Sequence, residues 1–198
     1  MNTLEELRSG KLQGIKQLKL SQNLESFPKE IFALAESLEI LDLSHNKLTT
    51  LPKEFSKLKK LKIAFFAEND FRSVPDVFRE CENLTMIGFK SNKIDTLGEN
   101  ILPANTRWLI LTDNKLQKLP ESMGKLMQLQ KVALAGNKLT QLPKSMANCT
   151  NLELVRLSAN KLEKIPSWLL SLPKLSWLAF SGNPCSVSRE SKFTSVSS

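Results

Sequence analysis

The sequence predicts an α/β solenoid, a single domain in which one short unit is stacked on itself along the chain. Three observations carry this prediction. Asparagine recurs every 22 or 23 residues, leucines stand at fixed offsets around it, and in five units a proline follows it at a fixed offset. A period of this length is typical of architectures in which each unit packs only on its neighbours. The periodic asparagines are Asn23, Asn46, Asn69, Asn92, Asn114, Asn137, Asn160 and Asn183.

Each unit is predicted to begin with a short strand, because leucine alternates there with polar or variable residues. In residues 38–60, Leu41 and Leu43 are expected to face the core, and Asp42 and Ser44 to face outward. The asparagine follows where the chain leaves the strand. A buried amide at that point can bind backbone groups of neighbouring turns, so the repeated asparagines predict a hydrogen-bonded ladder.

Proline is predicted to open the return half of each unit, because its fixed φ and missing N–H suit the first turn of a short helix. These prolines are Pro52, Pro75, Pro120, Pro143 and Pro166. The third unit departs from the pattern with Ala64 and Phe66 in place of leucine. The fourth unit is one residue short and has Gly98 where proline is expected. Irregular geometry is therefore expected near the middle of the stack.

The two ends are predicted to differ from the repeats that they flank. Residues 1–14 are expected to form a helical cap, in which Thr3 and Glu6 have the spacing of a capping box. The repeat domain is expected at 15–183, with about seven full units and a partial last one. Residues 184–198 are serine-rich and poor in apolar side chains, and are expected to form a C-terminal cap followed by a disordered tail or linker.

Composition points to a cytoplasmic protein without a membrane span. The chain has a net charge of +8, no signal peptide and no apolar run of bilayer length. It has three cysteines, and Cys81 and Cys149 stand at positions that hold leucine in other units. These two are expected to be buried thiols, because unpaired cysteine packs as a small apolar residue.

No pattern in the sequence predicts an enzyme. The single histidine, His45, is expected to be a solvated turn residue, with a weak contact to Glu68 one unit further on. Cysteine and histidine show no metal-ligand spacing, and no phosphate-binding loop or kinase catalytic motif is present. No catalytic residue, metal site, cofactor or small-molecule substrate is therefore expected.

The outward strand positions predict a continuous apolar surface across the third, fourth and fifth units. Side chains at equivalent positions of adjacent strands are direct neighbours. Gly88 is expected to leave a shallow hollow beside Trp108, and Trp177 with Leu154 is expected to form a second patch near the C-terminal end. Contiguous aromatic-rich surface is typical of partner-binding sites. The central patch consists of Ile63, Phe65, Met86, Trp108 and Ile110.

Charged side chains form two further groups around this surface. Four of them are expected to orient a bound partner: Asp42, Glu68, Asp113 and Arg156. Five lysines each follow a ladder asparagine and are expected to line one rim of the stack: Lys47, Lys93, Lys115, Lys138 and Lys161. The plain interpretation of this row is a solvated, solubilising face.

The repeated frame resembles the intracellular leucine-rich repeat family. Units 38–60, 129–151 and 152–174 follow the pattern LxxLxLxxNxLxxLPxxIxxLxx most closely, and the resemblance extends over residues 15–183. It implies a right-handed horseshoe, with short parallel strands on the concave face and short helical, 3-10 and loop segments on the convex face. It also implies that the concave face binds partners.

Four segments are similar to the N-terminal repeat domain of bacterial leucine-rich-repeat protein kinases. They are residues 7–48, 86–94, 107–125 and 167–184. This resemblance implies a regulatory domain of a serine/threonine-kinase-like protein, with no catalytic residues in the chain itself.

Three functions remain open from the sequence. The first is a protein-interaction module that binds a protein or peptide on the concave face. The alternative is the kinase-regulatory domain, and a weaker alternative is recognition of a polyanion by the lysine rim. Nucleic acid is not expected as a partner because no nucleic-acid motif is present. The capped ends favour a monomer.

Overall fold

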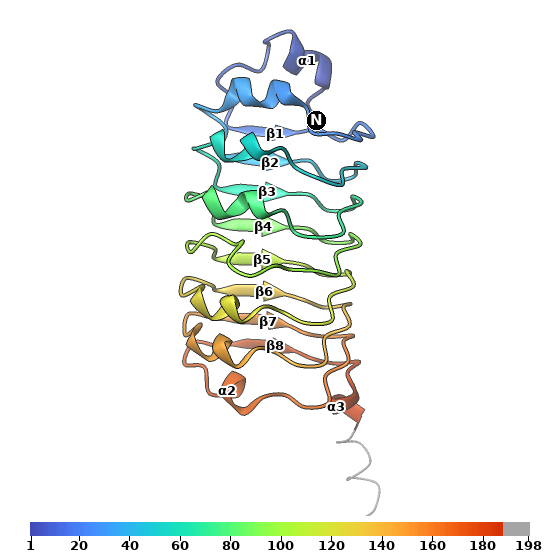
Figure 1. Cartoon of the computed structure of the whole chain (residues 1–198), viewed down its shortest axis with the longest axis vertical. Helices are drawn as coiled ribbons and strands as arrows, with labels where there is room; N and C mark the ends of the chain where they lie inside the picture. The colour runs from blue at the N-terminus through green and yellow to red at the C-terminus, as the bar shows by residue number, and fades with distance from the viewer. Residues whose placement is uncertain (188–198) are drawn as a thin grey trace, which may run out of the picture.

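The computed structural model describes residues 1–187, and Figure 1 shows them as a ladder of short strands with helical segments along the other face. The strands form one eight-stranded parallel sheet in sequence order. The predicted repeat solenoid is therefore confirmed. Of the predicted C-terminal cap and tail at 184–198, residues 184–187 form a short helix, and the rest lies outside the described residues.

The eight strands are three residues each, and each pairs in register with the next. Ile40 lies opposite Ile63, and Met86 lies opposite Trp108. Equivalent positions of successive units therefore form continuous rows across the sheet. The strands are β1 (Gln17–Lys19), β2 (Ile40–Asp42), β3 (Ile63–Phe65), β4 (Met86–Gly88), β5 (Trp108–Ile110), β6 (Lys131–Ala133), β7 (Leu154–Arg156) and β8 (Trp177–Ala179).

The return halves of most units contain one short helical segment on the convex side. A proline with extended backbone directly precedes six of these segments, so proline stands at the N-cap rather than inside the first turn. The 3-10 segments are η1 (Lys29–Leu34), η2 (Lys53–Lys57), η3 (Asp76–Glu80), η4 (Glu121–Lys125) and η5 (Lys144–Asn148). The α-helices are α1 (Leu4–Arg8), α2 (Ser167–Leu170) and α3 (Pro184–Val187).

Helix α1 closes the N-terminal end with the predicted capping box. The Glu6 N–H donates to the Thr3 hydroxyl at 3.1 Å, and the Glu6 carboxylate accepts from the Thr3 N–H at 2.9 Å. Leu7 of this helix is buried against the first unit. The cap therefore covers apolar surface that a terminal unit would otherwise expose.

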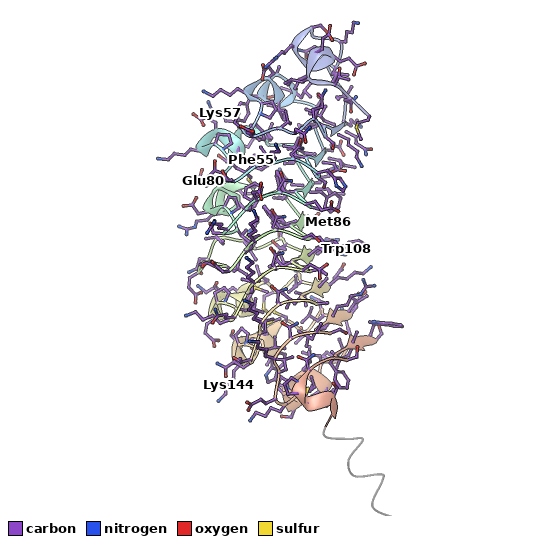
Figure 2. The ribbon with its side chains drawn as sticks, turned by 90° about the vertical axis from the view of Figure 1, so that its right-hand side faces the viewer. Phe55, Lys57, Glu80, Met86, Trp108 and Lys144 are labelled. Atoms are coloured by element: carbon purple, nitrogen blue, oxygen red, sulfur yellow. The ribbon has the colours of Figure 1, made fainter. Side chains whose placement is uncertain are left out.

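The core lies between the strands and the convex segments, and aromatic rings fill it in the irregular third and fourth units. Phe66 and Phe89 replace leucine there, and their rings stack with centroids 4.9 Å apart. Phe55 and Phe78 approach each other edge to face at 5.5 Å. Figure 2 places Phe55 inside the stack, with Met86 and Trp108 on the strand side and Lys57, Glu80 and Lys144 on the convex side. The larger rings keep this part of the core filled.

Seven of the eight periodic asparagines form the predicted ladder. Asn137 is typical: its amide nitrogen donates to the carbonyls of Leu111 and Leu134 at 2.8 and 2.9 Å, and its amide oxygen accepts from the Leu116 N–H at 3.0 Å. Asn23 is the exception, and its predicted place in the ladder is wrong. Asn23 is exposed with a φ of 55°.

The first unit is shorter around Asn23, and this shifts the chain out of the ladder. The amide oxygen of Asn46 accepts from the N–H groups of both Gln22 and Leu24, which flank Asn23.

Ser44 was expected to face outward, but the structure shows little of it exposed to solvent. Ser44 is buried, and its hydroxyl accepts from the Ala67 N–H at 3.1 Å.

The irregular geometry expected near the middle of the stack lies in the return half of the fourth unit, whereas the third unit keeps its helical segment. Residues 98–105, all of them described, form no helix. Asn100 holds this loop, because its carbonyl accepts from Arg79 Nε at 2.9 Å and its side-chain oxygen accepts from Lys125 Nζ at 2.7 Å. The Glu99 carboxylate accepts from the Ser122 N–H at 2.9 Å. The hydrogen bonds from the Ser122 side chain and backbone lower the pKa of Glu99.

Candidate functional site

The outward side chains of the strands form two rows on the concave face. The first row begins each strand and runs Ile63, Met86, Trp108, Lys131, Leu154 and Trp177. Of these, Ile63, Met86, Trp108 and Leu154 are partly buried, while Trp177 is 59% exposed. The strand register thus brings the predicted apolar residues of the third, fourth and fifth units into one surface.

The second row contains the predicted hollow at Gly88, and that prediction is wrong. A Cβ atom added at Gly88 would lie 2.7 Å from Cδ1 of Phe65 and 3.8 Å from Cβ of Ile110. The Phe65 ring therefore lies over Gly88 and fills the space. The ring of Phe65 on β3 thus extends over β4 toward Ile110 on β5.

Lys131 caps the aromatic face of Trp108. Its ammonium lies 3.9 Å from the centroid of the Trp108 ring, and the two residues are register partners on β5 and β6. This contact is a cation–π interaction, which is favourable because the face of the ring is electron-rich. This contact was not predicted from the sequence, although the equal offsets of Trp108 and Lys131 in adjacent units are the signal that could have revealed it.

A hollow of about 360 Å³ lies beside this pair on the concave face. Its apolar lining includes Trp108, Ile110, Ala133 and Leu154. Ala133 stands between Ile110 and Arg156 in the register, and its small side chain leaves room between them. Three cations also line the hollow: Lys90, Lys131 and Arg156.

Asp42, one of the acidic residues expected to orient a partner, is paired within the chain. Asp42 Oδ2 lies 3.1 Å from Lys19 Nζ, and its Oδ1 accepts from the Ser44 N–H at 3.0 Å. Burial by itself raises the pKa of Asp42. The hydrogen bonds from Ser44 and the neighbouring Lys19 ammonium outweigh burial and hold the pKa below its ordinary value.

The remaining acidic candidates, Glu68 and Asp113, each follow the end of a strand, β3 and β5 respectively. Glu68 Oε2 lies 2.9 Å from His45 Nδ1, so the expected His–Glu contact is present. Asp113 is exposed, with a φ of 55° at the end of its strand segment. Among the four charged candidates, only Arg156 lines the hollow.

The five lysines of the predicted rim are all exposed. Lys93 forms an ion pair with Asp70, the residue that interrupts the row. The rim is therefore partly neutralised at this point and divided into shorter basic stretches.

Another hollow, of about 250 Å³, lies on the convex side beside the irregular fourth unit. Its lining includes Pro103, Pro120, Met123, Lys125 and Leu126. It forms where the loop at 98–105 replaces a helical segment, so it is a consequence of the same one-residue deletion.

Among residues 1–187 there is no group of three or more His, Cys, Asp or Glu side chains that could hold a metal ion. Cys81 and Cys149 are buried, as predicted, and burial raises the pKa of each thiol to about 11. Both are therefore protonated at neutral pH, the unreactive form. Within the described part of the chain, no helix has the length and apolarity to span a bilayer.

The leucine-rich repeat family model matches residues 18–63, 104–162 and 127–184, together more than half of the chain. Solved structures agree with this match. A leucine-rich repeat protein of Leptospira interrogans shares 28% identity over 82% of this chain, with a TM-score of 0.75. An internalin of Listeria monocytogenes shares 23% identity over 90%, with a TM-score of 0.72.

A chain in the complex of Toll with Spätzle from Drosophila shares 26% identity over 83% of this chain, with a TM-score of 0.70. The chain spans 47%, 50% and 24% of the lengths of these three neighbours, respectively. A comparison with curated protein sequences gave no significant match.

Proposed function

The chain belongs to the leucine-rich repeat family, and we propose that it is a module that binds a protein or peptide on its concave face. The observation that supports this proposal is the register of β3, β4 and β5, which places their apolar outward residues side by side, with the Phe65 ring over Gly88 toward Ile110. Trp108 and Met86 extend the patch along the adjacent row. Such a surface is costly to leave in water, and aromatic residues near the centre of an interface often dominate its binding energy.

The rigid strand scaffold supports this role. Each patch residue lies on a strand of the sheet, and the inward residues Ala64, Ile87 and Leu109 beside them are fully buried. The surface is therefore held in one shape before a partner arrives, which reduces the entropy lost on binding.

We predict that Trp108→Glu weakens partner binding by ~2 kcal/mol or more, because a charge then replaces the central aromatic anchor. The test is affinity capture from native cytosol with the wild-type chain and with the double variant Phe65→Glu/Trp108→Glu as baits. A partner retained by the wild type and lost from the variant supports the proposal. Binding constants for the recovered partner then measure the effect of the single substitution.

Leu170→Glu is the matched control, because Leu170 is 63% exposed on α2 and lies on the opposite side of the stack. Circular dichroism establishes that all variants are folded. Equal recovery of the partner by the wild type and a folded double variant would reject the concave patch as the binding site.

Two narrower functions stay predictions from the sequence. One is regulation of a serine/threonine-kinase-like protein, which rests on the resemblance of residues 7–48 and three other segments to kinase-linked repeat domains. The other is polyanion recognition by the lysine rim, for which binding would fall steeply with salt concentration. The ion pair between Lys93 and Asp70 weighs against a continuous basic rim.

A further inference from the structure

We propose that the hollow between β4 and β7 binds an acidic segment of the partner, with carboxylates on its three cations and an apolar side chain on its floor. This inference rests on the proposed concave-face function and names the chemistry of the partner. The cations are Lys90, Lys131 and Arg156, and the floor is Trp108, Ile110 and Leu154. We call this site the basic hollow.

The three cations of the basic hollow lack acidic partners within the described chain. The six ion pairs among residues 1–187 involve other cations, including Lys19 with Asp42 and Lys62 with Glu39. On the N-terminal part of the concave face, positive charge is thus balanced locally. In the basic hollow, the positive charge of the three cations has no acidic counterpart among the described residues and is available to a ligand.

The distribution of acidic residues strengthens this contrast. The outward positions of β3 to β8 carry no acidic side chain, whereas Asp42 stands on β2 and is paired with Lys19. Glu153 precedes β7 and Asp113 follows β5, so both lie at strand ends and neither lines the hollow. The central and C-terminal strands therefore present one sign of charge around an apolar floor.

The dimensions of the hollow suit an extended peptide segment. Neighbouring strands are about 4.8 Å apart, so β4 and β7 are separated by roughly 14 Å. An extended chain covers about 3.3 Å per residue, so roughly four residues cross the hollow. Such a segment can place a carboxylate near Lys90 and another near Arg156, with an aliphatic or aromatic side chain between them over Ile110 and Ala133.

The contact between Lys131 and Trp108 favours an acidic peptide over a nucleic acid. Single-stranded nucleic acids bind by stacking bases on exposed aromatic faces. Here the ammonium of Lys131 already lies over the Trp108 ring, 3.9 Å from its centroid. A carboxylate can pair with that ammonium where it lies, whereas a base would have to displace it.

The experiment is selection of a phage-displayed random peptide library on the intact chain. We expect the enriched peptides to carry adjacent acidic and large apolar residues. A fluorescein-labelled copy of the most enriched peptide is then titrated against the double variant Lys131→Glu/Arg156→Glu. We expect its affinity to fall at least tenfold in this variant, and to fall with rising salt concentration in the wild type.

The matched control is Lys115→Glu/Lys138→Glu, which makes the same change in net charge on the rim. We expect it to leave the affinity within about twofold of wild type, because neither lysine lines the hollow and salt screens interactions between exposed charges. Circular dichroism and thermal melting establish that both variants are folded.

Four outcomes would overturn the proposal. The first two are a selection that enriches no peptide and one that enriches peptides without an excess of acidic residues. The third is an equal loss of peptide affinity in the two double variants. The fourth is binding of labelled oligothymidylate that depends on Lys131 and Arg156 while peptide binding does not. Capture of a partner that depends on Phe65 and Trp108 but not on Lys131 and Arg156 would keep the concave-face function and remove only the acidic ligand.

Discussion

The buried amide of each ladder asparagine performs a task that the similarly sized aspartate cannot. Asn137 donates two hydrogen bonds to carbonyls on adjacent units and accepts one from the Leu116 N–H. A carboxylate has no donor at neutral pH and would face the carbonyls of Leu111 and Leu134 with negative charge. The side chain therefore satisfies backbone groups that would otherwise be buried without partners.

We expect Asn137→Ala to lower the free energy of unfolding by about 3 kcal/mol, because each orphaned buried polar group costs about 1–3 kcal/mol. Chemical denaturation followed by circular dichroism measures this change. Asn148→Ala is the matched control, since Asn148 is exposed at the end of η5. Equal midpoints for the two variants would show that the ladder contributes nothing to stability.

The residue before each ladder asparagine has a left-handed backbone that composition does not reveal. The non-glycine residues at this position have φ between 52° and 59°, and the two glycines have φ of 70° and 72°. These residues are His45, Glu68, Ser91, Asp113, Gly136, Ala159 and Gly182. Only glycine adopts such angles readily. The chain turn is thus imposed by the hydrogen bonds around it and not by the local residue type.

At the scale of elements, the convex segments pack closely enough to require a glycine. A Cβ atom added at Gly124 of η4 would collide with the backbone carbonyl and the Cβ of Ser145 in η5. Backbone atoms cannot rotate away as a side chain can. The spacing of these two segments therefore depends on the absence of a side chain at residue 124.

We expect Gly124→Ala to destabilise the fold by about 1–3 kcal/mol, the usual cost of overpacking a well-packed contact. Gly98→Ala is the control, because a Cβ there would meet Ile101 only at an ordinary contact distance of 3.4 Å. Thermal melting of both variants measures the difference. A Gly124→Ala variant that melts at or above the wild-type temperature would contradict the close contact.

The fourth unit shows how one missing residue changes an element without breaking the stack. Strand β5 keeps its register with β4, while residues 98–105 form a loop in place of a helix. Glu99 and Asn100 tie this loop to η4 through Ser122 and Lys125. The strands tolerate the shorter unit because Ile87 and Leu109 stay buried and in register, so the change in length falls on the convex side.

At the scale of the whole molecule, each strand pairs only with the strands of adjacent units. Stability is then close to a sum over units and their interfaces, so the ends are the weakest part of the array. At β8 the inward residue Leu178 and the following Phe180 are only partly buried. At β5, by contrast, Leu109 and Leu111 are fully buried.

We expect amide hydrogens of β4 to β6 to exchange with deuterium more slowly than those of β8. Fewer apolar contacts have to be lost when the last unit opens, so its opening costs less free energy. Hydrogen exchange followed by mass spectrometry of peptides measures this gradient. Uniform protection from β2 to β8 would show that the stack opens as one cooperative unit.

The sequence was sufficient for the class of fold, the strands and the core. The asparagine period and the alternation around residues such as Leu41 and Leu43 give each unit the same frame, and equal frames bring equivalent residues into register. The neighbourhood of Ile63, Met86 and Trp108 follows from this regularity. The capping box of Thr3 and Glu6 was also readable, because it depends only on local spacing.

The shape of the candidate site depended on tertiary structure. Phe65 covers Gly88, and Lys131 lies over Trp108, because side-chain rotamers respond to neighbours on other strands. Asn23 leaves the ladder because a shortened turn moves it relative to the unit beside it. Periodicity assigns each residue to a face, whereas the packing of side chains between units decides which spaces on that face are filled and which charges remain without a partner.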